Sequence, residues 1–224
     1  MAKRRQSRQK RKSRIKQRER RQQLIIFGFL GGILALFLGI IAYNIINAPP
    51  DVADARLERE AVLGQPNASV QIVEYGAYGC PHCRDFHESG EVERLIETYG
   101  DVQFVFRNAP FISGNDKRGA EAAQCALDQG DEAFWAMHDA IFSLPTDEFI
   151  ETNDGDMVEL AREADIDAEA LEQCLDDRTH ERTVDYWETD RVREGITSTP
   201  TLFVNNQFVD INSLEAAVSA AVGS

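Results

Sequence analysis

The stretch "EYGAYGCPHCRDF", residues 74–86, holds two of the chain's four cysteines, separated by a Pro-His pair. The residues before it, "ASVQIV" (68–73), are rich in β-branched side chains and predict a strand. The residues after it have apolar side chains at helical spacing. The cysteine pair therefore lies where a predicted strand passes into a predicted helix. Half a zinc site, a structural clip and a redox pair are three interpretations that this position leaves open.

The flanking segments predict an α/β fold. We expect a strand over 68–76, a helix from Cys80 to about Tyr99, and a second strand over 101–108, "DVQFVFRN". Strand, helix and strand within about 40 residues form a βαβ unit, in which the two strands are parallel.

An all-helical insertion follows this unit, from about residue 113 to residue 195. The predicted helices span 116–129, 131–143, 154–164, 167–177 and 179–194. After the insertion, "TPTLFVNNQFVD" (199–210) predicts a hairpin that turns at Asn205-Asn206. A last helix is expected over Ser213–Val222.

Charge is divided unevenly along the chain. Residues 1–23 carry 12 of the 24 Lys and Arg residues and one of the 38 Asp and Glu residues, whereas Leu24 to Ile46 carry none of either. As a helix, this apolar segment would be about 34 Å long, which is enough to cross a bilayer core of roughly 30 Å. Cleavable signal peptides have shorter apolar regions of about 7–15 residues. We therefore expect a retained, single-pass membrane anchor.

The basic tail predicts how that anchor is oriented. Basic tails can bind nucleic acid, but next to a membrane span a basic run holds the N-terminus in the cytoplasm, so no nucleic-acid partner is expected. The predicted order is a cytoplasmic tail over 1–23, a transmembrane helix over 24–46, a stem over 47–66 and a folded domain over 67–224. That domain would lie on the extracytoplasmic side of the cell membrane, where disulfides persist.

The position of Cys80 favours a reactive thiolate. Unpaired N–H groups and the helix dipole stabilise an anion at the first turn of a helix, and cysteines of CxxC motifs at such sites have pKa values of about 3.5–7.5 instead of about 8.5. Pro81 suits the first helical position because it has no N–H group to leave unpaired, and His82, when protonated, would add positive charge. Cys83 can attack a mixed disulfide formed at Cys80. We expect Cys80 to be the more exposed nucleophile and Cys83 the buried resolving thiol.

A zinc site at this pair is disfavoured. Structural zinc needs four ligands, the nearby sequence adds only His87, and Cys125 and Cys174 each stand alone. We therefore expect no metal and no cofactor. Outside the cytoplasm, Cys125 and Cys174 instead predict a second disulfide, with two separate buried thiols as the alternative.

Three segments resemble the DsbA family of thioredoxin-fold thiol–disulfide oxidoreductases. They are "VLGQPNASVQIVEYGAYGCPHC" (62–83), "FWAMHDAIF" (134–142) and "TPTLFVN" (199–205). The resemblance covers about residues 60–222 and implies a thioredoxin fold, with its βαβ and ββα halves separated by the helical insertion.

The resemblance also implies roles for three residues outside the cysteine pair. Pro200 would be a cis-proline beside the start of the CxxC helix. The exposed backbone of Thr199 could pair with an extended substrate segment as an added strand. Glu74 would be a buried acid that carries the proton of the resolving thiol Cys83.

The leading functional hypothesis is an oxidase. Its Cys80–Cys83 disulfide would take electrons from the thiols of unfolded exported proteins, and the resemblance implies a quinone-linked membrane partner that restores it. An isomerase or reductase on the same fold, for example in cytochrome maturation, is an alternative, because the Pro-His pair alone does not set a reduction potential. A non-catalytic binding module with a static disulfide is a second alternative.

Overall fold

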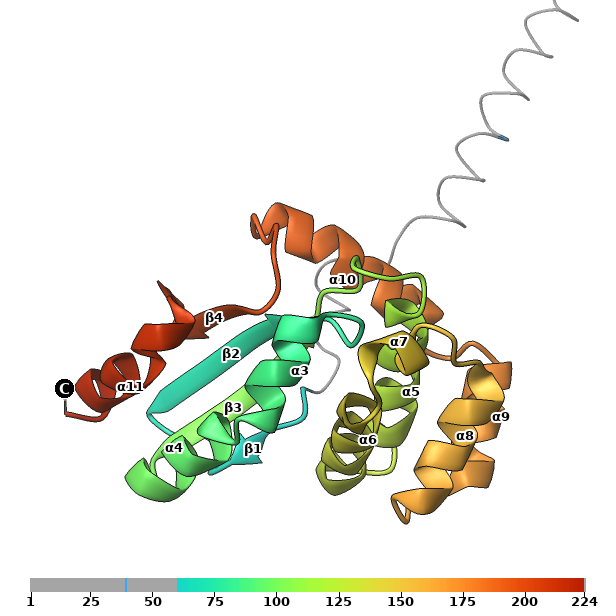
Figure 1. Cartoon of the computed structure of the whole chain (residues 1–224), viewed down its shortest axis with the longest axis horizontal. Helices are drawn as coiled ribbons and strands as arrows, with labels where there is room; N and C mark the ends of the chain where they lie inside the picture. Colours follow the sequence, from blue (N-terminus) through green and yellow to red (C-terminus); the bar gives the residue numbers. More distant parts are fainter. Residues whose placement is uncertain (1–38, 40–59, 224) are drawn as a thin grey trace, which may run out of the picture. The chain divides into compact units, whose positions relative to one another are not determined.

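The computed structural model describes Gly39 and residues 60–223. Residues 60–223 fold around one five-stranded sheet with the strand order β1-β3-β2-β4-β5 (Figure 1). The strands are β1 (Leu63–Gly64), β2 (Val70–Gly76), β3 (Val102–Asn108), β4 (Thr201–Val204) and β5 (Gln207–Val209). After β5 come the 3-10 turn η1 (Ile211–Ser213) and the last helix, α11 (Leu214–Val222).

The pairing of β2 determines which segments meet at the cysteine pair. β2 and β3 are parallel over their whole length, with Gly76 opposite Asn108, which confirms the predicted βαβ unit. β4 runs antiparallel to β2, with Thr201 opposite Tyr75. The end of β2 and the start of β4 therefore lie side by side.

Two helices replace the single helix predicted after Cys80. α3 (Pro81–Glu88) and α4 (Glu91–Tyr99) are separated at Gly90, whose φ of 63° is in the left-handed region that glycine adopts readily. Both helices bury apolar side chains in the same core. The periodic pattern therefore continues across the break and does not reveal it.

The helical insertion agrees with the prediction. Its helices are α5 (Asp116–Leu127), α6 (Asp131–Ser143), α7 (Thr146–Phe149), α8 (Asp154–Glu163), α9 (Ala168–Asp176) and α10 (Glu181–Arg193). Five of the six match predicted helices, whereas α7 is too short to produce a periodic pattern. Helices α5 to α9 lie together at one side of the sheet, and α10 leads back to β4 (Figure 1).

The sheet is covered on both faces. Ile72 and Phe104 belong to the main core, which includes α3, α4, α11 and the insertion. Val73 and Val105, on the other face, form a smaller core with Ile196. Because both faces are covered, β2 and β3 are buried along nearly their whole length, as is typical of parallel strands between two layers.

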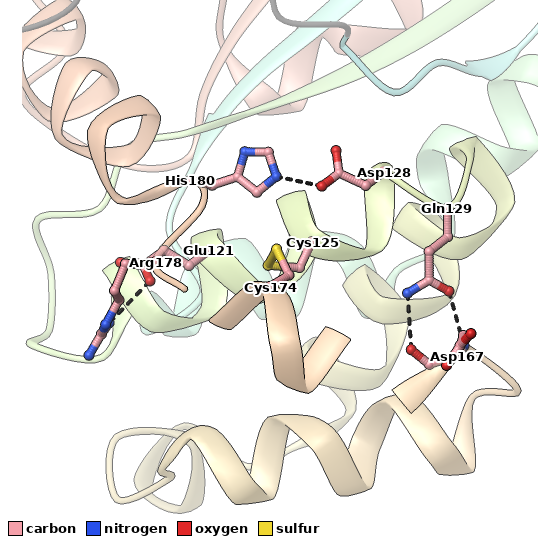
Figure 2. Close-up of a disulfide and its surroundings, with 8 residues drawn as sticks. All are labelled: Glu121, Cys125, Asp128, Gln129, Asp167, Cys174, Arg178 and His180. Carbon is pink, nitrogen blue, oxygen red and sulfur yellow. Dashed lines mark hydrogen bonds and ion pairs between the residues drawn. A yellow bond between two sulfur atoms is a disulfide. The ribbon is translucent and has the colours of Figure 1, made fainter. Parts of the chain in front are cut away.

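A disulfide joins two helices of the insertion. Cys125 of α5 and Cys174 of α9 are bonded, and their Cα atoms are 5.8 Å apart (Figure 2). Beside the bond, Arg178 pairs with the buried carboxylate of Glu121 at 3.1 Å. The two cysteines that the sequence leaves for a second disulfide are therefore the ones that form it.

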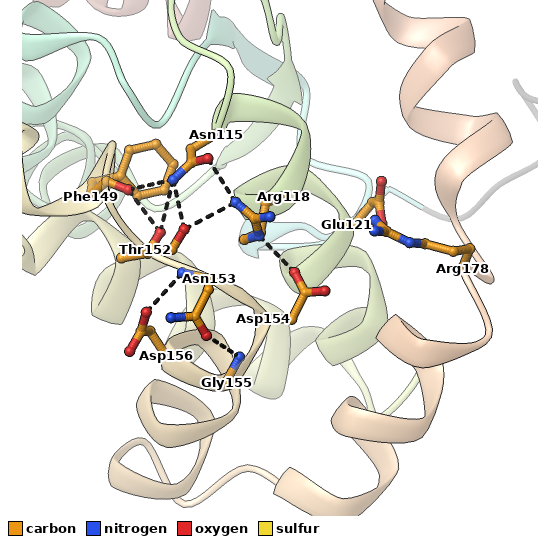
Figure 3. Close-up of polar contacts among 10 residues, drawn as sticks. All are labelled: Asn115, Arg118, Glu121, Phe149, Thr152, Asn153, Asp154, Gly155, Asp156 and Arg178. Atoms are coloured by element: carbon orange, nitrogen blue, oxygen red, sulfur yellow. Dashed lines mark hydrogen bonds and ion pairs between the residues drawn. The ribbon is translucent and has the colours of Figure 1, made fainter.

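A polar network attaches the segment between α7 and α8 to the start of α5 (Figure 3). The Asn115 side-chain amide donates to the backbone oxygens of Phe149 at 3.0 Å and Thr152 at 2.9 Å. Arg118 pairs with Asp154 at 2.6 Å. These contacts fix the segment that follows α7 to the start of α5.

The folded domain begins earlier than predicted. Leu63 and Gly64, which the sequence places in the stem over 47–66, form β1 and pair antiparallel with Phe104 and Gln103. A strand of two residues is too short to give an alternating pattern. The stem prediction is therefore wrong for its last residues.

The predicted tail, the transmembrane helix and most of the stem lie outside the described residues, apart from Gly39. Across residues 60–223, none of the helices combines the length and apolar character that a membrane span needs.

Replacing both Cys125 and Cys174 by alanine is expected to lower the free energy of unfolding by about 4 kcal/mol, because the bond closes a 49-residue separation that is open in the unfolded variant. Denaturant unfolding of the full chain in detergent, with Cys80 and Cys83 oxidised in both proteins, measures the difference. Equal unfolding free energies would contradict a stabilising role.

Candidate active site

Cys80 is the residue that caps the N-terminus of α3. Its backbone is extended, with φ −90° and ψ 116°, and Pro81 takes the first helical position. The Cys80 carbonyl accepts a hydrogen bond from the Arg84 N–H at 3.1 Å, and the Cys80 N–H donates to the Ala77 carbonyl at 3.0 Å. The thiol group therefore lies at the positive end of the helix dipole, as the sequence predicts.

The turn before Cys80 is held by a residue that the sequence reasoning missed. The Gly79 N–H donates to the buried Asp116 carboxylate at 2.7 Å, which also accepts from the N–H groups of Ile112 and Ser113 at 2.6 Å each. A Cβ atom at Gly79 would lie 2.5 Å from the Ser113 hydroxyl oxygen, so only glycine fits. Asp116 lies several residues after β3, and its distance in sequence from the CxxC motif is not characteristic of any known motif. The sequence therefore carries no signal for this contact.

Thr199 and Pro200 reach the same turn from the start of β4. The Thr199–Pro200 peptide bond is cis, and the Thr199 carbonyl oxygen lies 3.3 Å from the Cys80 sulfur, to which a protonated thiol can donate. The Thr199 hydroxyl is buried and has no hydrogen-bond partner among the described residues. It is therefore free to donate to the sulfur when Cys80 is a thiolate.

The surroundings of Cys80 favour its charged form. The largest effect on the pKa of Cys80 is a hydrogen bond from the Cys83 thiol, which lowers it. Burial raises this pKa, whereas hydrogen bonds from the Thr199 side chain and from the backbone N–H groups of Cys83 and His82 lower it further. Together these effects lower the pKa of Cys80 from 9.0 to about 5. A free Cys80 is therefore an anion at neutral pH.

Cys83 has the opposite character. Burial is the main cause that raises the pKa of Cys83 far above its usual range, and the Cys80 and Glu74 groups add to the rise. Its exposed fraction is 0%, against 4% for Cys80. The order of exposure agrees with the predicted one, although both thiols are buried.

Glu74 is a buried acid that interacts with both cysteine sulfurs. Burial raises the pKa of Glu74 to about 8; a hydrogen bond with Cys83 acts in the other direction, and charge on Cys80 adds to the rise. In a mixed disulfide the Cys80 sulfur carries no charge, so one influence that keeps Glu74 protonated is removed. A larger fraction of Glu74 is then ionised and available to accept the Cys83 proton.

The imidazole of His82 is exposed and lies beside an acidic side chain. Its side chain is 82% exposed and lies 3.9 Å from the carboxylate of Asp85. The His82 group that lowers the pKa of Cys80 is its backbone N–H. The structure therefore gives the helix backbone, and not the ring, the contact that the sequence assigned to His82.

A groove of about 820 Å³ is lined by Pro200 and by His82, which lies between the two cysteines in the sequence. Phe86, Leu202 and Phe208 supply apolar surface, and Phe208 is 68% exposed. Thr199 also lines the groove. The groove therefore places apolar surface next to the Thr199–Pro200 segment, whose Thr199 carbonyl contacts the Cys80 sulfur.

The arrangement can break and form disulfides in two steps. One sulfur is an anion at neutral pH and can attack or leave, while its neighbour keeps its proton until the mixed disulfide forms. The protein is a thiol–disulfide oxidoreductase on a thioredoxin-type α/β fold.

Comparison with known proteins agrees with this class. Residues 56–223 match the sequence profile of the family described as Thioredoxin, and the chain belongs to that family, in which it is DsbA-like. It is 29% identical over 210 residues to a "Probable disulfide bond formation protein D" of Bacillus cereus, with 88% of this chain and 95% of that protein covered. The structure of oxidised BdbD from Bacillus subtilis superimposes with a TM-score of 0.66 at 26% identity, covering 74% of this chain and 94% of that one.

A third relative has a different name. The chain is 30% identical over 173 residues to the Na(+)/H(+) antiporter NhaA 3 of Salinispora tropica, with 75% of this chain but only 25% of the antiporter covered. The match therefore concerns a minor part of that protein.

Titration of the reduced protein is expected to show one thiolate with a pKa close to 5, because the pKa of Cys80 is lowered to that value. The measurement is the ultraviolet absorbance of the thiolate as a function of pH. Cys83→Ala removes the largest cause of the lowering, so the pKa of Cys80 should rise in that variant. A wild-type transition near the ordinary cysteine value would contradict the assignment.

Glu74→Gln is expected to make the attack of Cys83 on a mixed disulfide about 100-fold slower, because it removes the proton acceptor. A chromophoric thiol attached to Cys80 reports this step when Cys83 releases it. Glu121→Gln, which removes another buried carboxyl, in the middle of α5, is the control and should release the thiol at the wild-type rate.

The same variant tests the pKa of Glu74. A raised pKa means that the folded state binds the proton more tightly than the unfolded state, so wild-type stability falls as pH rises from about 4.5 through about 8. Glu74→Gln should lack that loss. A parallel pH dependence in the two proteins would contradict the raised pKa.

Proposed function

We propose that this protein is a membrane-anchored oxidase that introduces disulfides into exported proteins. The observation that carries the proposal is the stabilised thiolate of Cys80, whose pKa is lowered to about 5. Stabilising the thiolate stabilises the reduced enzyme, and this makes the Cys80–Cys83 disulfide a strong oxidant. The Bacillus relatives are named disulfide bond formation proteins, which supports disulfide formation as the direction of the reaction.

The proposed reaction transfers two electrons from the substrate to the enzyme. A substrate thiolate attacks the Cys80 sulfur of the Cys80–Cys83 disulfide, and Cys83 leaves and takes up a proton, with Glu74 as its source. A second substrate thiolate then attacks the substrate sulfur that is bound to Cys80. The substrate disulfide forms, and Cys80 leaves as the stabilised thiolate.

A partner must then remove the two electrons. We propose a quinone-linked membrane protein, as the DsbA resemblance implies. The apolar segment from Leu24 to Ile46 would hold the enzyme at the membrane surface where such a partner lies, with the basic tail in the cytoplasm and the domain outside.

A reductase is the alternative that shares this fold. The low pKa of Cys80 argues against it, because a reductase needs a disulfide that is harder to reduce. The static disulfide of a binding module would not need a stabilised thiolate.

The reduction potential of Cys80–Cys83 tests the proposal. Equilibration with glutathione redox buffers should give a value more oxidising than about −180 mV, and the oxidised protein should form disulfides in a reduced test protein. A potential near about −270 mV would indicate a reductase, and a disulfide that does not exchange would indicate a binding module. In intact cells, a membrane-impermeant thiol reagent should label the reduced enzyme at Cys80; protection from the reagent would contradict the proposed location.

A further inference from the structure

A second cluster of ligand-type side chains lies where α3 contacts α6. It consists of His87, in the last turn of α3, and His138 and Asp139 of α6. One ring nitrogen of each histidine and one carboxylate oxygen of Asp139 lie within 4.8 Å of one another. The disulfide chemistry uses none of the three residues.

The spacing of His87 and Asp139 suits a bound cation. The Nε2 atom of His87 lies 3.7 Å from the Oδ1 atom of Asp139. Two ligands of a tetrahedral zinc ion, each bonded at about 2.0–2.2 Å, are about 3.3–3.6 Å apart. These two groups therefore need to move by only a few tenths of an ångström to bind one ion.

His138 is held as a metal-bound histidine usually is. Its side chain is 3% exposed, and its Nδ1 atom lies 3.1 Å from the hydroxyl of Tyr78, within hydrogen-bond distance. Phe106 fixes the plane of the ring edge-on, at 4.5 Å between ring centroids. Histidines that bind metals are commonly oriented by a partner on the nitrogen that does not bind. With Nδ1 paired to Tyr78, Nε2 is the nitrogen left for an ion.

The cluster is open to solvent on the side of His87 and Asp139, where acidic side chains lie nearby and Arg84 pairs with one of them, Glu88, at 2.8 Å. The side chains of His87 and Asp139 are 23% and 64% exposed. Both line a surface cavity of about 510 Å³, together with Glu88 and Glu93, and none of the residues described as lining it is a lysine or arginine. A cation can therefore enter from this side, and water can complete its coordination.

We infer that His87, His138 and Asp139 form a site for one divalent transition-metal ion, for which zinc has the best-matched ligand preference. Two imidazoles and one carboxylate suit zinc better than calcium or magnesium, which prefer oxygen ligands. The ion would connect the last turn of the active-site helix α3 to α6 of the insertion. This site is separate from the cysteine pair, at which the sequence predicts no metal, and does not rest on the proposed direction of the reaction.

The test is equilibrium dialysis of the full chain in detergent against Zn²⁺, with both cysteine pairs oxidised so that no thiol can bind the ion. The wild-type protein should bind one Zn²⁺ per chain, and Co²⁺ in its place should give the visible absorption of a tetrahedral ion. His87→Ala and Asp139→Ala should each weaken binding at least tenfold. Both residues are partly exposed, so these variants should fold.

The matched control is His180→Ala, which removes a histidine that pairs with Asp128 at 2.9 Å in another part of the insertion. This variant should bind Zn²⁺ as the wild type does. Zn²⁺ should also raise the unfolding temperature of the wild type and not that of His87→Ala. The inference is overturned by the absence of stoichiometric binding, by binding that survives His87→Ala, or by binding that His180→Ala removes.

Discussion

The negative charge on the Cys80 sulfur is the constraint on which the rest of the domain depends. To stabilise it, the sulfur must lie at the start of a helix, beside Cys83 and against Thr199, which comes 119 residues later in the chain. The sheet makes this possible because β2 ends beneath α3 and β4 begins next to the same end. A strand order that separated β4 from β2 would remove Thr199 from the sulfur and leave the helix alone to hold the charge.

The helical insertion also holds the turn that carries Cys80. Its first helix begins with Asp116, whose carboxylate holds the N–H of Gly79, the residue before the nucleophile. The network of Asn115 and Arg118 fixes the start of that helix to the segment after α7. The turn that presents Cys80 therefore depends on a helix bundle that contributes no reacting atom.

The sequence predicts the local features of this molecule well, because they depend on neighbouring residues. The strand before Cys80, the helix that begins there and five insertion helices all follow from short-range periodicity. The break at Gly90 and the short strand β1 do not, since one leaves the apolar pattern intact and the other is too short to have one. The contact of Asp116 with Gly79 is invisible for another reason: it joins two segments, and nothing in their spacing indicates that they meet.

The active-site residues likewise differ in how far local sequence predicts them. The reactivity of Cys80 can be argued from its place on a helix, whereas the positions of Pro200 and Glu74 came from resemblance, because no local rule brings residue 200 to residue 80. His82 shows the limit of local reasoning even within the motif. Its ring is exposed, and its backbone N–H lowers the pKa of Cys80, an effect that the sequence analysis assigned to the charge of the ring.

The bond between Cys125 and Cys174 has a consequence for how the protein matures. A newly made chain leaves the ribosome with four thiols, so an oxidant must form the bridge between α5 and α9, and under the proposed function this happens after the chain is exported. Under the proposed function, a finished copy is such an oxidant, so this enzyme belongs to its own set of clients. The supply of active molecules would then grow from those already present, and a cell that had lost every copy would need another oxidant to produce the first.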